Sequence, residues 1–311
     1  MTSLLCGLNG RDLLSSADLT REETSELLHL ARRLKAGELR IDLGGRVLGL
    51  IFSKASTRTR VSFSVAMARL NGQTIDLLPI VTQVGRGEPV ADTARVLSRY
   101  CDALAIRTFA QEELSEYAHW ATIPVVNGLT ELEHPCQALA DYLTLQEAFG
   151  DVGGLTLAYV GDGNNVAHSL LLTGALLGVN VRIGCPEGFA PSSAVVEQAR
   201  HLANGRCELS VVHEPLAAVR GAHALYTDVW ASMGQEEERM ARERAFAGWC
   251  LDETLLSEAD GRAIVLHCLP AHRGEEITAG VIEGSASRVF DQAENRLHVQ
   301  QALLAALLGG I

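Results

Sequence analysis

The segment Ser-Thr-Arg-Thr-Arg at residues 56–60 combines hydroxyl groups with arginines at the start of a predicted helix. It follows an apolar run over 47–52 that is typical of a buried strand. A helix N-terminus attracts anions through its dipole and its N–H groups, and a guanidinium can clamp two phosphate oxygens. The segment therefore indicates a phosphate site, although a serine-capped helix with surface arginines has the same pattern. The helical pattern after it predicts four inward side chains, Val61, Val65, Ala68 and Leu70.

Other polar residues stand where further strands are expected to end. Arg107 ends the strand expected over 102–107, and a charge in that place serves either a ligand or a salt bridge. His134 and Gln137, three residues apart at the start of the next helix, face one side of it and could hydrogen-bond a carbonyl oxygen and an amide. Because ligands collect at the carboxyl ends of parallel strands, we expect these groups to share one site.

The second half of the chain offers amide, carboxylate and thiol groups at the strand ends. Residues 161–165, Gly-Asp-Gly-Asn-Asn, form a predicted tight turn that presents Asn165 to the site. A dinucleotide fingerprint would need a third glycine where Val166 stands, which argues against NAD binding. Asp228 could pair with an ammonium group. Cys268 is placed for a binding contact, since a reactive thiolate would need a cationic neighbour.

Strand and helix patterns alternate along the whole chain. We expect strands at 46–52, 73–78, 102–107, 123–127, 155–160, 179–184, 208–212, 223–227 and 263–267. We expect helices after a capping box at Thr20 and Glu23, running to Lys35, and at 57–70, 90–100, 111–120, 136–148, 164–177, 191–203, 235–246 and 293–308. This alternation predicts an α/β protein with two parallel sheets flanked by helices, joined at the glycine-rich segment 149–154.

The composition excludes several classes of protein. A chain of 311 residues with 47% hydrophobic residues has enough core for two domains. The net charge of −12 argues against a nucleic-acid partner, and the sequence lacks the 18-residue apolar run of a membrane span. Seven scattered cysteines without CxxC pairs predict neither disulfides nor a zinc site. The N-terminus has no leader pattern, so we expect a cytoplasmic protein.

Taken together, the motifs resemble those of the aspartate/ornithine carbamoyltransferase family, and of the ornithine carbamoyltransferases within it. The resemblance extends from Arg11 to Arg296. Its motifs are 56–60, 85–88, 91–95, Arg107, 134–137, 164–165, Asp228 with 232–234, 267–270 and 295–296. It implies transfer of the carbamoyl group of carbamoyl phosphate to the δ-amine of L-ornithine, which gives L-citrulline and phosphate.

The resemblance also implies how the chain is organised. Residues 1–147 with about 292–311 would bind carbamoyl phosphate, residues 148–291 would bind ornithine, and the C-terminal helix would pack back on the first domain. A homotrimer with sites at subunit interfaces is implied, and no metal or organic cofactor. The family often has Glu where this chain has Ser53, which precedes the phosphate site and is not a ligand, so we expect little effect. Arginine synthesis and arginine breakdown would use the same site.

Residue roles are implied by position in the family's motifs. The carbamoyl phosphate site would comprise Ser56, Thr57, Arg58, Thr59, Gln83, Arg107, His134, Pro135, Cys136, Gln137, Cys268, Leu269 and Arg296. The ornithine site would comprise Asn165, Asp228, Ser232 and Met233. Catalytic roles would fall to Arg107, His134, Gln137 and Cys268. Closure around Gly150 is expected to bring the substrates together, and Arg107, His134 and Thr59 would stabilise the oxyanion formed when the neutral amine attacks.

Alternative functions follow from the same residues. An enzyme that acts on aspartate would need cationic residues for the second carboxylate, whereas Asp228 favours a substrate with an α-amino group. Putrescine and N-acetylornithine stay open as alternative acceptors. A non-catalytic carbamoyl phosphate-binding subunit would have lost part of the set Arg58, His134, Gln137 and Cys268, which is intact here.

Overall fold

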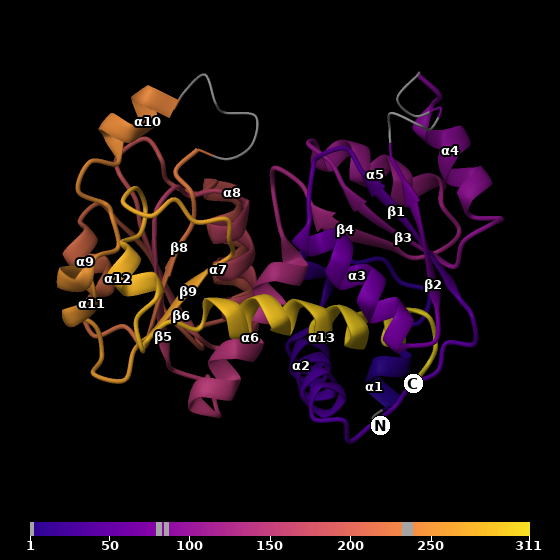
Figure 1. Cartoon of the computed structure of the whole chain (residues 1–311), viewed down its shortest axis with the longest axis horizontal. Coiled ribbons are helices and arrows are strands. Elements are labelled where there is room, and N and C mark those ends of the chain that lie inside the picture. The colour runs from indigo at the N-terminus through magenta and orange to yellow at the C-terminus, as the bar shows by residue number, and fades with distance from the viewer. Residues whose placement is uncertain (1–2, 79–82, 84–86, 232–238) are drawn as a thin grey trace. The chain divides into compact units, whose positions relative to one another are not determined.

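The computed structural model of the chain describes residues 3–78, 83, 87–231 and 239–311. The chain divides into two compact units, Met1–Leu143 with Glu294–Ile311, and Thr144–Ala293. The divisions fall inside helix α6 (Pro135–Phe149) and close to the start of helix α13 (Val289–Leu307). Each unit is built on one parallel sheet with helices packed against it (Figure 1). The predicted α/β class with two parallel sheets is confirmed.

The first unit contains a four-stranded sheet in the order β2-β1-β3-β4. Its strands are β1 (Val47–Phe52), β2 (Gln73–Leu77), β3 (Ala103–Arg107) and β4 (Val125–Leu129). The chain adds β2 on one side of β1 and then β3 on the other, so the strand order reverses between β1 and β3. Ligands of open parallel sheets bind at such a switch point, beyond the carboxyl ends of the strands. Phe52 of β1 pairs there with Arg107 of β3.

The helices of the first unit begin and end close to their predicted positions. They are α2 (Arg21–Lys35), α3 (Arg58–Arg69), α4 (Val90–Leu97), α5 (Gln111–Trp120), most of α6 and most of α13. The predicted capping box starts α2, because Thr20 Oγ1 accepts the Glu23 N–H at 3.1 Å and Glu23 accepts the Thr20 N–H at 2.8 Å. Helix α1 (Ser3–Cys6) and the 3₁₀ helix η1 (Ser16–Asp18) were not predicted, since each is too short to show an apolar period.

Helix α3 buries a different face from the one that the sequence predicts. The buried apolar side chains are Phe63, Ala66, Met67 and Leu70. Their spacing is that of a single helical face. Val61 and Val65 are 53% and 37% exposed, and Ala68 is exposed too, so only Leu70 of the predicted inward set is confirmed. The prediction was wrong because α3 carries apolar side chains on two faces, and periodicity alone does not tell which face meets the sheet.

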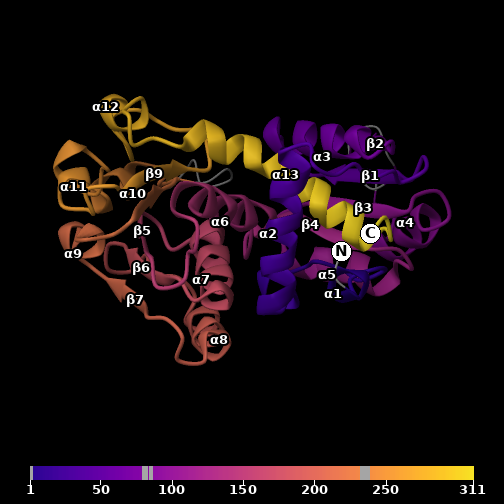
Figure 2. The same ribbon diagram turned by 90° about the horizontal axis from the view of Figure 1, so that it is seen from below.

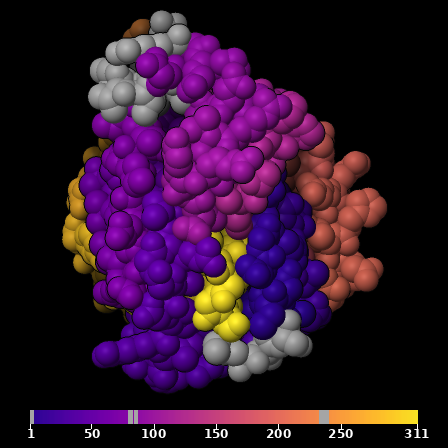
Figure 3. All heavy atoms as spheres, turned by 90° about the vertical axis from the view of Figure 1, so that its right-hand side faces the viewer, coloured from indigo at the N-terminus to yellow at the C-terminus, as the bar shows by residue number. Residues whose placement is uncertain are grey.

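The C-terminal helix α13 packs on the first unit, as expected. Arg296 Nη2 donates to Thr59 Oγ1 of α3 at 2.7 Å, and Lys35 Nζ of α2 donates to Asn295 Oδ1 at 2.7 Å. Two views place α13 beside α2 and α3 (Figures 1 and 2). The end of the chain lies among N-terminal segments (Figure 3), where the Gly10 N–H donates to the carbonyl oxygen at 307 at 2.9 Å. The last helix is therefore an integral part of the unit that carries the predicted anion site.

The second unit contains a five-stranded sheet in the order β7-β6-β5-β8-β9. Its strands are β5 (Thr156–Val160), β6 (Asn180–Gly184), β7 (Leu209–Val212), β8 (Ala224–Thr227) and β9 (Ile264–His267). The order reverses between β5 and β8, where Val160 pairs with Thr227. A second switch point therefore lies next to the turn at 161–165 and next to Asp228.

The helices of the second unit include short ones that the sequence did not predict. They are α7 (Asn165–Leu177), α8 (Ser193–Ala203), α9 (Pro215–Val219), α10 (Arg239–Ala245), α11 (Glu253–Ser257) and α12 (Ala279–Ile282). The helix predicted over 235–246 falls partly outside the described residues, and α10 occupies the rest. Within the described ranges, no helix combines the length and apolar character needed to cross a membrane.

Candidate active site

The carboxyl end of β1 leads directly into the predicted phosphate-binding segment. Ser56 Oγ accepts the Thr59 N–H at 3.3 Å, which fixes the turn that enters α3. Thr57 occupies the N-cap position without a side-chain cap bond. Thr59 is fully buried, and its hydroxyl oxygen accepts the hydrogen bond from Arg296. The first turn of α3 and the last helix of the chain are thus joined by a buried polar contact.

His134 is buried and lies within reach of the charges of three arginines. The residue directly precedes α6 and is 4% exposed. Burial lowers the pKa of its imidazole well below 6.5, and the positive charges of Arg296, Arg107 and Arg58 lower the pKa further. The ring is therefore neutral and sits within the field of three guanidinium groups. The structure thereby brings together four predicted site residues whose positions in the sequence extend from 58 to 296.

The two arginines of the segment 56–60 have different surroundings. Arg60 forms an ion pair with Asp76 near the end of β2 and lies over the ring of Phe52, 5.1 Å from its centroid. Arg58 instead contributes to the positive field at His134. Of the two, Arg58 is the candidate anion ligand and Arg60 is a structural residue.

Three further predicted residues of the first unit lie in contrasting places. Pro135 is the first residue of α6. The Cys136 thiol is fully buried and donates a long hydrogen bond of 3.8 Å to the carbonyl oxygen of Asn127. Burial raises the pKa of this thiol to about 12, so it stays protonated. Gln83 is exposed, and its carbonyl oxygen accepts the Glu88 N–H at 3.1 Å.

Gln137 is held by a buried acid that the sequence did not suggest. Its Nε2 donates to Asp141 Oδ1 at 2.8 Å, one helical turn further along α6. Gln137 is 1% exposed and Asp141 is fully buried. The spacing of four residues on a predicted helix is a signal that could have identified this pair.

In the second unit, the turn after β5 is braced by Asn164. Its Oδ1 caps α7 by accepting the N–H groups of Val166 at 2.9 Å and Ala167 at 3.2 Å. Its Nδ2 donates to Asp228 Oδ2 at 2.8 Å. Asn165 is the first residue of α7 and is half-buried. The turn therefore uses one asparagine to connect the two strands of the switch point, a role that the sequence analysis did not assign.

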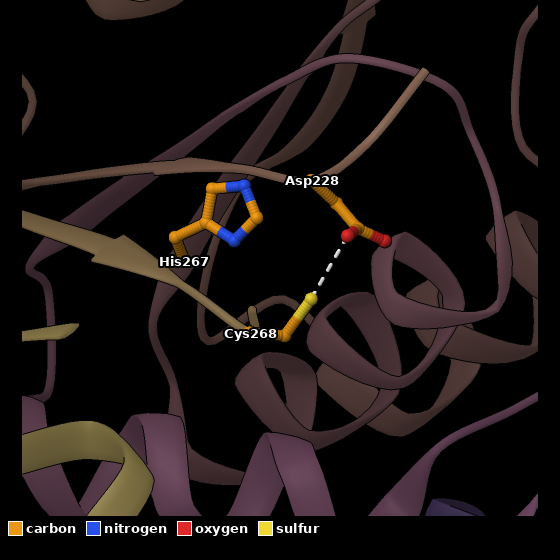
Figure 4. Close-up of side chains that lie close together, drawn as sticks. All are labelled: Asp228, His267 and Cys268. Atoms are coloured by element: carbon orange, nitrogen blue, oxygen red, sulfur yellow. Dashed lines mark hydrogen bonds between the residues drawn. The ribbon is translucent and has the colours of Figure 1, made fainter. Parts of the chain in front are cut away.

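Asp228 and Cys268 are in direct contact at the ends of β8 and β9 (Figure 4). The Cys268 Sγ donates to Asp228 Oδ1 at 2.9 Å, and the Val229 N–H donates to the same oxygen at 2.8 Å. Asp228 is only 6% exposed. Because its neighbour is a carboxylate and not a cation, the thiol is placed to donate a hydrogen bond and not to act as a nucleophile.

His267 supports the loop that carries Cys268. Its Nδ1 accepts the Leu269 N–H at 2.8 Å, which places the ring proton on Nε2, 3.1 Å from Glu276 Oε1. The side chains of His267 and Glu276 are both fully buried. Leu269 has φ +58, a left-handed conformation that is uncommon for a residue with a side chain. The His267–Glu276 pair therefore holds a strained turn in place.

The ligand atoms of Asp228, His267 and Cys268 lie within 4.8 Å of one another, a spacing that a metal ion could bridge. The hydrogen bonds argue against that use. Nδ1 of His267 accepts from Leu269 and Nε2 donates to Glu276, so metal binding through either nitrogen would break one of these two hydrogen bonds. The group is better suited to hold an organic ammonium group at Asp228.

The predicted site residues Ser232 and Met233 lie outside the described residues. On either side of them, Arg242 of α10 forms a largely buried ion pair with Asp162 at 2.7 Å and donates to the carbonyl oxygen of Trp230 at 3.0 Å. This pair was not predicted, because its members are 80 residues apart and no helical spacing relates them. It attaches the chain on both sides of the segment 232–238 to the turn after β5.

Two family models match the chain and together cover most of it. The carbamoyl-P binding domain of aspartate/ornithine carbamoyltransferase matches residues 11–147, and the Asp/Orn binding domain of the same family matches residues 153–307. The chain belongs to the aspartate/ornithine carbamoyltransferase family. The first match covers the arginine group around His134, except for Arg296, and the second covers the Asp228–Cys268 contact.

Similar proteins within this family are named ornithine carbamoyltransferases. The ornithine carbamoyltransferase of Parasynechococcus marenigrum (strain WH8102) is 71% identical over 311 residues, which cover 100% of this chain and 98% of the relative. The crystal structure of ornithine carbamoyltransferase from Gloeobacter violaceus is 55% identical with a TM-score of 0.89, over 97% of this chain and 99% of that one. The enzyme from Pyrococcus furiosus is 48% identical with a TM-score of 0.94, over 98% and 99% of the two chains.

The buried His267–Glu276 pair generates a prediction about stability. Glu276→Leu leaves the Nε2–H of His267 without its acceptor, and we expect the free energy of unfolding to fall by about 1–3 kcal/mol in urea titrations. Glu276→Gln keeps an accepting oxygen and should lose less. As a control, Glu275→Leu alters a partly exposed neighbour and should change stability by less than about 0.5 kcal/mol. Equal losses at 275 and 276 would contradict this account of the turn.

Proposed function

We propose that this protein transfers the carbamoyl group of carbamoyl phosphate to the δ-amine of L-ornithine and releases L-citrulline and phosphate. The observation that carries the proposal is the neutral, buried His134 within the field of Arg58, Arg107 and Arg296. Three positive charges around one buried ring are stable when an anion joins them, and a phosphate ester supplies that charge. The names of the relatives and their high identity over nearly the full chain support ornithine as the acceptor.

We assign carbamoyl phosphate to residues 1–147 with about 292–311, and ornithine to residues 148–291. In this assignment the phosphate binds to Ser56, Thr57, Arg58 and Thr59, while Arg107, His134 and Gln137 bind the carbamoyl group. Pro135, Cys136, Leu269, Arg296 and, from another subunit, Gln83 complete the carbamoyl phosphate site. A neutral imidazole can donate one hydrogen bond to the carbonyl oxygen, as can a guanidinium.

The ornithine site is proposed to be negative. Asp228 is a buried carboxylate that already accepts from Asn164, Cys268 and Val229, which keeps it oriented for an α-ammonium group. Asn165, Ser232 and Met233 are the further proposed contacts. N-acetylornithine has no charged α-amino group to pair with Asp228, which disfavours it. Putrescine has two amines but no α-carboxylate. Assays of carbamoyl transfer to ornithine and to putrescine distinguish these two acceptors.

In the proposed reaction, the neutral δ-amine attacks the carbamoyl carbon, and a C–N bond forms as the bond from that carbon to the phosphate oxygen breaks. The amine loses one proton, which leaves with the phosphate. Negative charge develops on the carbonyl oxygen, and Arg107, His134 and Thr59 are the donors proposed to stabilise it. Cys268 orients Asp228 and lies next to the amino acid. The acyl phosphate is already activated, so the step requires neither a metal nor an organic cofactor.

We also propose a cytoplasmic homotrimer. The support for assembly is a set of exposed apolar side chains on two neighbouring elements of the first unit, called here the apolar surface: Val61 and Val65 of α3, and Ile75 and Leu78 in and just after β2. Strand β2 is also an edge strand of its sheet. An exposed edge strand next to an apolar helix face is typical of a protein–protein interface, and a second copy of the chain is its proposed partner.

The arginines of residues 56–60 provide a matched pair of variants. Arg58→Ala should lower kcat/KM for carbamoyl phosphate by about 10²–10³-fold, because it removes a charged anion ligand. Arg60→Ala removes only the partly exposed pair with Asp76 and should cost less than about fivefold. Citrulline formation measures both variants. Comparable activities of the two would show that the phosphate site has been misplaced.

The pH dependence follows from the neutral state of His134. Since its pKa lies well below 6.5, this ring does not titrate between pH 6 and 9 and adds no acidic limb there. The ornithine δ-amine resembles that of lysine, with a pKa of about 10.4, and must lose its proton to react. We expect kcat/KM for ornithine to rise by about tenfold per pH unit over this interval. A flat or falling profile would refute the mechanism.

The same pKa shift sets the sign of a stability effect. His134 is neutral in the folded state and regains an ordinary pKa of about 6.5 on unfolding. The unfolded state therefore binds more protons below pH 6.5, and the folded state loses stability as the pH falls through that value.

The apolar surface generates a prediction about assembly. Val61→Asp places a charge on the surface formed by Val61, Val65, Ile75 and Leu78, and it should reduce the mass in light scattering from three times the 33.4 kDa chain toward smaller species. Leu216→Asp is the control, because Leu216 is a 40% exposed apolar residue on α9 of the second unit. A variant at 61 that assembles like the unaltered protein would exclude this surface as the interface.

A further inference from the structure

The hydrogen bond between Gln137 and Asp141 determines which way the Gln137 amide faces. The Gln137 amide nitrogen Nε2 donates to Asp141 Oδ1 at 2.8 Å, so the nitrogen end of the amide faces the acid. The Gln137 oxygen Oε1 is therefore directed away from the acid. Both residues lie on α6, four positions apart, and both are buried, so neither side chain can exchange this bond for one to bulk water.

The Gln137 Oε1 atom is buried and has no hydrogen-bond partner among the residues that the structure describes. A buried acceptor without a donor costs about 1–3 kcal/mol, which a ligand that supplies the donor would recover. Gln137 also lies one turn after His134, whose carbonyl oxygen accepts the Gln137 N–H at 3.0 Å. The acceptor thus lies in the first turn of α6, directly after the histidine on which the three arginine charges act.

The charged groups around His134 can only donate hydrogen bonds. Arg58, Arg107 and Arg296 suit the phosphate and carbonyl oxygens of an acyl phosphate. They cannot recognise its acyl substituent when that substituent is an NH₂ group, which is itself a donor. An acceptor is needed there, and Gln137 Oε1 offers one.

We propose that Asp141 is a specificity-determining positioning residue: by fixing Gln137 with its oxygen toward the ligand, it selects acyl phosphates that carry an N–H group next to the carbonyl carbon. This inference rests on the proposed carbamoyl phosphate site. Acetyl phosphate, which has a methyl group in place of the NH₂, presents the same phosphate and carbonyl oxygens. Acetyl phosphate leaves Gln137 Oε1 without a hydrogen-bond donor, so the Asp141–Gln137 pair disfavours its binding.

The test compares the two ligands without turnover. Equilibrium binding of carbamoyl phosphate and of acetyl phosphate is measured by calorimetry for the unaltered protein and for Asp141→Leu, and the ratio of the two dissociation constants is calculated. In Asp141→Leu the Gln137 amide is free to turn, and we expect the preference for carbamoyl phosphate to fall about tenfold to a hundredfold, with little change for acetyl phosphate. Asp141→Asn, which can accept or donate, should show a smaller fall.

Two further variants define the mechanism. Gln137→Met removes the acceptor itself, and combining it with Asp141→Leu should lower the ratio no further, because the two residues act through one contact. Glu147→Gln removes an exposed carboxylate from the same helix and should leave the ratio unchanged. A merely structural role for Asp141 would weaken both ligands equally.

An unchanged ratio in Asp141→Leu overturns the proposal, whether both ligands weaken or neither does. If Asp141→Leu does not fold, Asp141→Asn carries the test, and an unchanged ratio there has the same consequence. Failure of the proposed function is seen separately, as absence of citrulline formation by the unaltered protein with carbamoyl phosphate and ornithine.

Discussion

The structure depends on keeping three guanidinium groups close to one buried, uncharged imidazole. Like charges repel one another, and burial raises the energetic cost of each charge. The guanidinium groups therefore need hydrogen-bond acceptors that hold them in place without neutralising their charge. Arg296 has one in the Thr59 hydroxyl, a neutral acceptor that leaves the positive charge undiminished. Because the chain carries a net charge of −12, an anion site on it requires such a local concentration of arginine.

The two units apply the same topology to opposite charges. In each, the strand order reverses once, and the polar residues stand at the carboxyl ends of the two strands that flank the reversal. The first unit fills that position with Arg107 and the start of α3, and the second fills it with Asn164 and Asp228. The two proposed substrates, an acyl phosphate and an amino acid with two amines, differ most in charge, which is why we assign one of them to each switch point.

The sequence predicted the elements well because local rules determine them. Alternating patterns located all nine described strands, and the capping box located the start of α2. The prediction of the buried face failed on α3, because two faces of that helix are apolar. Val61 and Val65 have the same helical period as the buried Phe63 and Met67. The strand ends predicted that Arg58, Arg107 and His134 lie near one another, but the place of Arg296 was predicted only through family resemblance, since no spacing rule connects position 58 with position 296.

Buried acceptors are the part of the site that sequence motifs do not reveal, because their partners are other side chains of the site. Asp141 orients Gln137 and Glu276 orients His267, each through a hydrogen bond in which a carboxylate accepts. A carboxylate has no donor to offer, so it imposes one orientation on an amide or an imidazole where a neutral partner would permit two. The orientation of a polar side chain of the site is therefore set by a neighbouring carboxyl group behind it. Because that carboxyl group is buried, water does not compete for the hydrogen bond.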